Sequence, residues 1–586
     1  MFEETDLERG IVNNVKDLED QKKKKTIIFT IIGITSIILI IGLILLLVKL
    51  LVNNKDKKDS SQKNSELIYG LLECTYYNGI GDKAFIFSNN SIDLSPLEIT
   101  INNETYKGIN VQLTQSGYVK VAIKFNSPLN MDYLFSGTQL DGIKMISTNK
   151  GVILSMKETF SNCDRLDTFS ISGFDTRKVK NITRLFYKNE ELKKVNFNDF
   201  NTENIEDMSE LFSECTRIEN IDLSSFNTKK VKKMSKMFQE CRNLKNLDIS
   251  SFDTGNVEKM NKMFYFCTHL TNLTIPKTFK TNKVTSMGHM FEYCSVLTSI
   301  DLTSFDTSSV TNMGRMFIYC KAVTSLDFSH FNTTKVQKMN EMFSKCQNLE
   351  NLDISNFDTK NVYNMSLMFN SLKIKNLNLK NFNTNNVIEM DSMFKEMPNI
   401  EKLDLSSFDT SKVTSMKEMF EGCSNLKNII INTDKFDTRN VVNMAKLFNN
   451  CKMLINVDLT KFDTNNVEDM RNMFSGCESL NMLDFSSFDT ANVKNMDEMF
   501  SGLTLTSLDL SNFSTFEVRT MKQMFFSSKN LKFLNIVNFD THQCMNFEQI
   551  FEGTNNDLKI ILSEVNKDKN DNLIKNIGEN ITIEYI

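Results

Sequence analysis

One pattern of apolar and polar residues recurs through most of this chain. A clean copy at residues 244–267 reads Leu-x-x-Leu-Asp-Ile-Ser-Ser-Phe-Asp-Thr-x-x-Val-x-x-Met-x-x-Met-Phe-x-x-Cys. The first Phe of the pattern occurs fifteen times, at intervals of 25 to 28 residues, at positions 174, 200, 226, 252, 279, 305, 331, 357, 382, 408, 436, 462, 488, 513 and 539. A fixed period of this length predicts a solenoid, in which each unit buries its apolar face against its neighbours.

The repeat contains two kinds of apolar spacing. Leu247 and Ile249 alternate with polar residues, which predicts a short strand with both side chains on one side. Stacked units would pair these strands into a parallel sheet. The later Val, Met, Met and Phe fall at i, i+3, i+6 and i+7, which predicts a short helix packed on the sheet. The expected fold is therefore an α/β solenoid with one strand and one helix in each unit of about 26 residues.

A different apolar run lies near the N-terminus. Residues 27–48 contain no charged residue over 22 positions. At 1.5 Å per residue a helix of this length spans about 33 Å, enough for a bilayer core. A cleavable signal peptide is the alternative, but its apolar region is shorter and is followed by a small-residue cleavage site, which this chain lacks. The sequence therefore predicts one retained transmembrane helix.

The orientation of this helix follows from its flanks. Lys22 to Lys25 adjoin the run on one side, whereas Lys49, Lys55, Lys57 and Lys58 flank the other. The totals nearly balance, and the compact cluster at the boundary favours a cytoplasmic N-terminus. We expect a single-pass, type II protein in the cell membrane, with the repeats outside.

The remaining segments differ in composition from the repeats. Alternating apolar residues at 84–87, 97–101 and 118–123 predict strands of a small β cap before the first repeat. The expected division of the chain is a cytoplasmic tail at 1–26, the transmembrane helix at 27–48, a stalk at 49–66, the β-rich cap at 67–125, the solenoid at 126–555 and a C-terminal cap at 556–586.

Ten of the twelve cysteines share one position, three residues after the second Phe of the repeat. They are Cys163, Cys215, Cys241, Cys267, Cys294, Cys320, Cys346, Cys423, Cys451 and Cys477. Neighbouring units would bring them about 5 Å apart, so disulfides between units are geometrically conceivable. Leu and Met occupy the same position elsewhere, and some runs of cysteines have odd length. We therefore favour a ladder of buried free thiols.

An acidic residue recurs between the two inward-pointing strand positions. This candidate interaction stripe comprises Asp222, Asp248, Asp301, Asp327, Asp353, Asp404, Asp458, Asp484 and Asp509. Carboxylates aligned on an exposed sheet could attract a basic partner, or associate weakly with hard divalent cations such as Ca²⁺. The simpler interpretation is that these residues provide solubility and hydrogen bonding on an exposed strand.

Composition argues against several functional classes. The net charge is -5, whereas a nucleic-acid-binding protein is expected to carry a basic stripe. The four histidines lie at unrelated positions of the repeat, and no motif typical of hydrolases, nucleotide-binding loops or zinc proteases occurs. Cysteines 26 residues apart in a line cannot form a tetrahedral zinc site. We expect no enzyme activity, no cofactor and no bound metal.

The complete repeat, as it stands at residues 403–423, resembles that of the BspA-like leucine-rich-repeat surface proteins. The resemblance covers about residues 126–555. It implies a leucine-rich-repeat solenoid on a cell surface, often associated with adhesion to a host or matrix. The family has no shared catalytic or ligand residues to transfer. The N-terminal anchor departs from members that carry a signal peptide, a lipidated Cys or a C-terminal anchor.

Our leading hypothesis is a membrane-anchored surface protein whose solenoid binds other proteins or mediates adhesion to a host surface or extracellular matrix. One alternative is a structural or antigenic coat protein without a dedicated ligand. Another is a receptor or scaffold that signals through the short tail at 1–26.

Overall fold

The computed structural model describes residues 70–79, 84–88, 97–106 and 112–586. The tail, transmembrane helix and stalk predicted within 1–66 lie outside these residues. Along the part of the chain that is described, no helix is both long and apolar enough to cross a bilayer.

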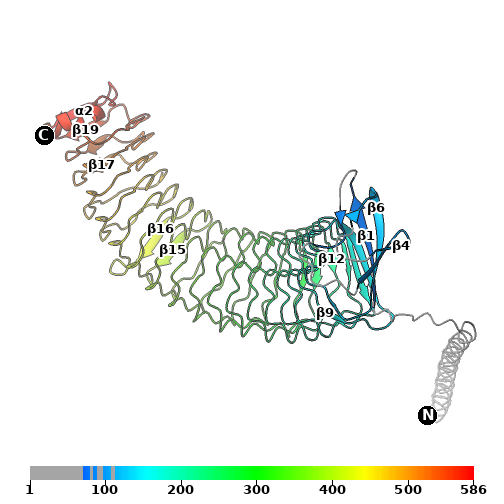
Figure 1. The fold of residues 1–586 in the computed structure, drawn as a ribbon. Coiled ribbons are helices and arrows are strands. Elements are labelled where there is room, and N and C mark those ends of the chain that lie inside the picture. The colour runs from blue at the N-terminus through cyan, green and yellow to red at the C-terminus, as the bar shows by residue number, and fades with distance from the viewer. Residues whose placement is uncertain (1–69, 80–83, 89–96, 107–111) are drawn as a thin grey trace, which may run out of the picture. The chain divides into compact units, whose positions relative to one another are not determined.

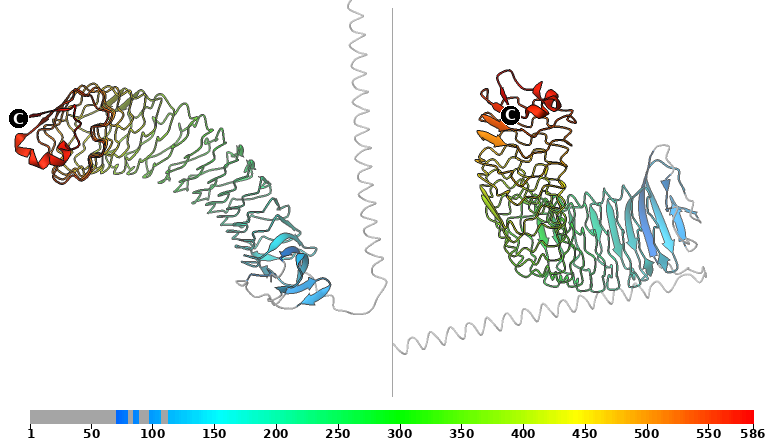
Figure 2. Two further views of the ribbon diagram at one scale, coloured as in Figure 1. Left: turned by 90° about the horizontal axis from the view of Figure 1, so that it is seen from above. Right: turned by 90° about the vertical axis from the view of Figure 1, so that its left-hand side faces the viewer.

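The repeats form coils that stack side by side in a single row (Figures 1 and 2). The register between coils is set by the repeat length. Asn246, Leu247 and Asp248 pair in parallel with the three residues 26 positions further along the chain. The predicted parallel solenoid is therefore confirmed, with the strand segments of successive coils on one side, here named the strand face.

The strands assigned within the coils are short and fall into groups. The first group is β12 (Asn220–Ile221), β13 (Asn246–Asp248) and β14 (Asn272–Thr274); the second is β15 (Lys402–Leu405) and β16 (Asn428–Ile431). The third is β17 (Ser507–Asp509), β18 (Phe533–Asn535), β19 (Lys559–Leu562) and β20 (Thr582–Tyr585). Between β14 and β15 the chain is fully described, yet no strand is assigned.

The N-terminal part extends the sheet of the solenoid. Its seven-stranded sheet has the order β11-β10-β8-β1-β6-β3-β4. The strands are β1 (Gly70–Asn78), β3 (Leu97–Ile101), β4 (Glu104–Tyr106), β6 (Gly117–Phe125), β8 (Leu140–Ile146), β10 (Thr168–Ser172) and β11 (Lys194–Asn196). Because β8, β10 and β11 are parallel coil strands and β1 pairs antiparallel to β8, the antiparallel strands cover the first coil by continuing its own sheet.

Two smaller strand pairs complete this region, and a few short helices follow the last coil. The pairs are β2 (Ala84–Phe85) with β5 (Gln112–Leu113) and β7 (Leu129–Asn130) with β9 (Ile153–Ser155). The helices are η1 (Glu564–Asn566), η2 (Asp568–Asn570) and α2 (Asp571–Ile574), before β20. Within 112–586, all of which is described, these are the only helices.

The helix predicted for each repeat is therefore wrong. On the side opposite the strand face, the chain forms consecutive turns that bond to the next coil, here named the turn face. The amide groups of Met234, Lys236, Phe238 and Glu240 donate to carbonyls of the following coil at 2.7 to 3.0 Å. The intervening amides donate three residues back, as from Met237 to Met234. Backbone groups that a helix would pair internally are thus shared between coils.

The apolar spacing could not distinguish these two structures. Met260, Met263, Phe264 and Cys267 are all fully buried, as a helix would require. A ladder of turns also directs side chains inward every three or four residues. It requires left-handed backbone at two positions per coil, and Lys236 (φ 59°) and Glu240 (φ 58°) supply them in one coil. Most residues at these positions are not glycine, so the sequence did not indicate left-handed backbone there.

The second Phe of the repeat forms a continuous column through the core. Seventeen rings stack from Phe135 to Phe551, with centroids of neighbouring rings 5.4 to 6.2 Å apart. Such aromatic contacts add about 0.5–1.5 kcal/mol each beyond the burial of area. The column ties every coil to both neighbours.

The Thr of the repeat is buried and joins successive coils. The Thr307 hydroxyl donates to the carbonyl of Asn332 at 2.9 Å and accepts the amide of the same residue at 2.8 Å. The same exchange occurs between Thr228 and Asp253. Because it satisfies a backbone donor and acceptor of the next coil, this hydroxyl explains why Thr recurs at a core position.

The cysteines form the ladder of buried thiols that we favoured. All twelve, every one of which lies among the described residues, are free and buried. The ten thiols at the shared repeat position each donate to the carbonyl of the core Phe of the preceding coil, as from Cys346 to Phe317 at 3.0 Å. Ser528 occupies the same position and donates its hydroxyl to Phe500 at 2.9 Å. Burial raises the pKa of Cys346 to about 12, so the thiol is neutral and unreactive at neutral pH.

We expect Thr307→Val to destabilise the solenoid by about 1–3 kcal/mol, because it leaves a partly buried amide and carbonyl of the next coil without a partner. Denaturant unfolding followed by circular dichroism measures the effect. Thr324→Val is the control, since Thr324 is exposed and should change stability by less than about 0.5 kcal/mol. Equal effects of the two substitutions would contradict the proposed role of the hydroxyl.

The thiol ladder also predicts a loss of stability in alkali. The pKa of a buried thiol is higher in the folded chain than in the unfolded one, so its stabilisation is complete below about pH 8.5. It is lost as pH rises towards about 12, by about 1.4 kcal/mol per pH unit for each thiol. Unfolding free energies measured from pH 8 to 11 should fall. The fall should be shallower when Cys346, Cys423 and Cys477 are replaced by Ser, which does not titrate; identical slopes would exclude this origin.

Candidate interaction surface

The predicted acidic stripe lies on the strand face. Eight of its nine Asp residues are exposed and Asp404 is half-buried. They occupy the same position of the coil. The strand pairing shows this register, because Asp248 lies beside Thr274, Asp404 beside Ile430 and Asp509 beside Asn535 of the following coil. The stripe is therefore real as an arrangement, but it is interrupted by Thr274, Asn378 and Ile430.

Each Asp of the stripe closes a local turn. Its Oδ1 accepts the backbone amide of the residue two positions on, at 2.8 to 3.1 Å in all nine cases. Asn378 and Asn535 make the same bond at 3.3 Å. These are Asx turns, which end the strand segment of each coil. The simpler structural interpretation of the acidic residue thus has direct geometric support.

The same turns lower the pKa of several of these carboxylates. Hydrogen bonds from the side chain and amide of Ser355 lower the pKa of Asp353 below its ordinary value, and the corresponding Ser residues do so for Asp222 and Asp404. Oδ2 of each of the nine makes no hydrogen bond or ion pair with any described residue. The strand face therefore presents a row of fixed negative charges, each with one oxygen available to a partner.

Other polar residues of the strand face satisfy one another. Asn246 donates to Asn220 at 3.1 Å, and Asn272 donates to Asn246 at 2.6 Å. One position before them in each coil, Lys245 pairs with Glu219 at 2.9 Å and Lys427 with Glu401 at 2.8 Å. In these coils the side chains stack in register, so neighbours of suitable chemistry meet.

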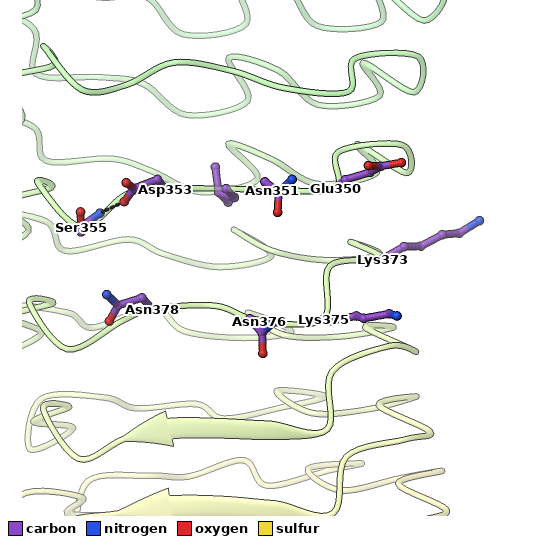
Figure 3. A pocket seen from close by; sticks show the side chains of 9 residues that line it. Glu350, Asn351, Asp353, Ser355, Lys373, Lys375, Asn376 and Asn378 are labelled. Carbon is purple, nitrogen blue, oxygen red and sulfur yellow. Dashed lines mark hydrogen bonds between the residues drawn. The ribbon is translucent and has the colours of Figure 1, made fainter.

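One section of the strand face is hollowed into a groove. Its volume is about 810 Å³, and it lies between the strand segments of two successive coils (Figure 3). It is lined by Glu350, Asn351, Leu352, Asp353, Ser355, Lys373, Lys375, Asn376 and Asn378. Glu350, Lys373 and Lys375 lie toward one end, whereas Asp353 and Asn378 lie toward the other. Asp353 belongs to the predicted acidic stripe, whereas the other residues that line the groove were not predicted as interaction residues from the sequence.

The groove accompanies an irregularity in the repeat. Phe357 and Phe382 are 25 residues apart, one fewer than in most units, and Leu372 replaces the usual Cys. The missing residue falls between Leu372 and Leu377, where the chain approaches the strand segment. No backbone hydrogen bond joins residues 351–353 to 376–378, both of which are fully described. The short interval was the signal in the sequence that could have indicated this site.

The turn face carries a separate charged cluster. Glu292 is 1% exposed and contacts Nδ1 of His289 at 2.6 Å and Nη2 of Arg315 at 3.2 Å. Stacked rings of Phe266, Tyr293 and Tyr319 lie nearby. Among the described residues no group of three or more His, Cys, Asp or Glu side chains could hold a metal ion.

Comparison with known proteins places this architecture in a family. Residues 154–277, 271–376, 345–453, 424–532 and 500–568 match a family described as Mycoplasma protein of unknown function, DUF285. These overlapping matches span more than half of the chain. The chain belongs to this family. Residues 78–208 also match the BspA-type leucine-rich-repeat region, which confirms the resemblance found in the sequence.

Solved structures with a similar fold include two bacterial leucine-rich-repeat proteins. One, from Bacteroides ovatus, is 16% identical with a TM-score of 0.38, and the match covers 85% of this chain and 100% of that protein. The other, from Eubacterium ventriosum, is 13% identical with a TM-score of 0.24, and the match covers 71% of this chain and 90% of that protein. No curated protein matches the chain.

Proposed function

We propose that this protein is anchored in the cell membrane by residues 27–48 and uses its solenoid, outside the cell, to bind other proteins. The leucine-rich-repeat fold supports a role in protein–protein interaction, and proteins with this fold are typically binding scaffolds. The uncharged run of 22 residues supports the anchor. Adhesion to a host surface or matrix is the form of binding that we propose.

The observation that carries this proposal is the row of exposed carboxylates on the strand face. Asp458, Asp484 and Asp509 lie on three successive coils without interruption. Strands of adjacent coils are about 4.8 Å apart, so three like charges are held within about 10 Å. A basic patch on a partner would gain from all three charges simultaneously, and such complementarity raises association rates and specificity.

The coat-protein alternative also has a supporting observation. Because every Asp of the stripe forms an Asx turn, its recurrence is explained without any ligand. A test must therefore separate the charge of the carboxylate from its role in the turn.

Replacement of Asp458, Asp484 and Asp509 by Asn makes that separation. Asn retains an Oδ1 acceptor, as Asn378 and Asn535 already show, but it removes the charge. We expect the triple Asn variant to retain the melting temperature of the parent protein. Its saturable binding to cultured host cells or immobilised matrix proteins should be at least tenfold weaker, and binding by the parent protein should weaken as salt concentration rises.

The matched control is the triple Ala variant, which removes both charge and turn. It should lose binding and also stability, by about 1 kcal/mol for each turn. Equal binding by the Asn variant and the parent protein would contradict a role for the stripe. An absence of saturable binding by the parent protein would favour the coat protein.

Protease treatment of intact cells tests the anchor and its orientation. We expect trypsin, which cleaves after the lysines at 55–63 of the proposed stalk, to release a fragment that contains the solenoid. Residues 1–26 should remain with the cells. An epitope tag at each end of the full chain, followed on immunoblots, distinguishes the two parts. Protection of the solenoid in intact cells but not in lysed cells would show that the orientation is wrong.

A further inference from the structure

The groove at residues 350–378 differs from two other pairs of neighbouring coils in the state of its charged groups. Glu350 and Lys375 occupy one and the same position in two successive coils. At this position in other neighbouring coils, Glu219 pairs with Lys245 at 2.9 Å and Glu401 pairs with Lys427 at 2.8 Å. Yet neither Glu350, Lys373 nor Lys375 forms an ion pair with any described residue. The coils that meet here hold opposite charges apart.

The carboxamides of the groove are also unoccupied. Asn351 and Asn376 continue the row that begins with Asn220 and Asn246, whose side chains bond to each other. In the groove, the side chains of Asn351 and Asn376 are exposed and form no hydrogen bond with any described residue. The backbone amides and carbonyls of 351–353 and 376–378 likewise bond to no other described backbone group. The groove thus combines free amide donors and acceptors along its length.

The charges of the groove are distributed asymmetrically. Two lysines and one glutamate lie toward one end, whereas Asp353 lies toward the other (Figure 3). Residues 350 and 353 are about 10 Å apart along an extended segment. A ligand that fits must therefore present an anion and a cation at roughly this separation, with hydrogen-bonding groups between them.

We propose that this groove binds a short, extended peptide segment. An acidic side chain of the segment would contact Lys373 and Lys375, a basic side chain would contact Asp353, and the peptide backbone would bond to Asn351 and Asn376. A peptide supplies both charges and alternating backbone donors and acceptors, which is the chemistry that the groove leaves unpaired. This inference rests on the protein-binding role proposed above and specifies where one segment of the partner binds.

The test uses the full chain in detergent micelles and a panel of fluorescent eight-residue peptides. Each peptide carries one Glu and one Lys, placed at every ordered pair of positions in a Ser–Thr background, and binding is followed by anisotropy. We expect saturable binding to be strongest for peptides whose charges are two or three positions apart in one order. Lys373→Glu combined with Lys375→Glu should weaken binding of those peptides at least tenfold.

Lys245→Glu is the matched control, because Lys245 occupies the same position as Lys375 five coils away but pairs with Glu219. It should leave peptide binding unchanged. Asn351→Ala with Asn376→Ala should weaken binding of all bound peptides regardless of the order of their charges. Circular dichroism of each variant verifies that the coils are intact.

The inference would be overturned by an absence of saturable binding by every member of the panel, or by equal binding by the parent protein and the lysine variant. Self-association of the full chain that the lysine variant abolishes, without peptide binding, would also overturn it and would identify a second copy of the chain as the occupant. The cell-binding assay with the Asn variant of Asp458, Asp484 and Asp509 is independent. Loss of adhesion without loss of peptide binding, or the reverse, shows which proposal has failed.

Discussion

Hydrogen bonding between one coil and the next is the constraint on which this structure depends. The coils, which lie wholly within the described residues, contain no helix that satisfies its own backbone, so their polar groups find partners about 26 positions away. On the turn face, alternate backbone amides donate to carbonyls of the following coil. The hydroxyl of the buried Thr also bonds to one backbone amide and one carbonyl of that coil. The pairing is possible only when residue types recur in register. The regularity of the sequence follows from this requirement.

Most of the conspicuous polar residues of the repeat therefore serve the coil itself. The Asp at the end of the strand segment forms a turn, the Thr links coils, and the Cys donates to a carbonyl. The residues that distinguish one coil from another are the ones left for individual function. Lys373, Lys375 and the shortened interval before Phe382 are such departures, as is the cluster around Glu292 on the turn face.

The sequence predicted the architecture well because burial in a solenoid is periodic. The inward positions Leu247, Ile249, Met260 and Phe264 are all buried, and the buried free thiols were anticipated. The helix was predicted incorrectly because a ladder of turns with left-handed residues such as Lys236 produces the same inward spacing. The groove was missed because the shortened interval that accompanies it leaves the hydrophobic pattern unchanged. The positions of the acidic stripe were correctly placed on one face, while its role in binding stays a prediction.

The contacts that the repeated Phe, Thr and Cys residues make between neighbouring coils do not depend on the number of coils. Each core Phe meets an equivalent ring before and after it, and each Thr and Cys hydroxyl or thiol bonds to backbone groups of a neighbouring coil. Recombination between equivalent positions of two repeats would therefore lengthen or shorten the molecule while leaving its interior chemistry intact. Such exchange would leave the groove in place unless the shortened coil beside Leu372 were itself lost, so the length of the solenoid and its binding groove can change independently among descendants of this gene.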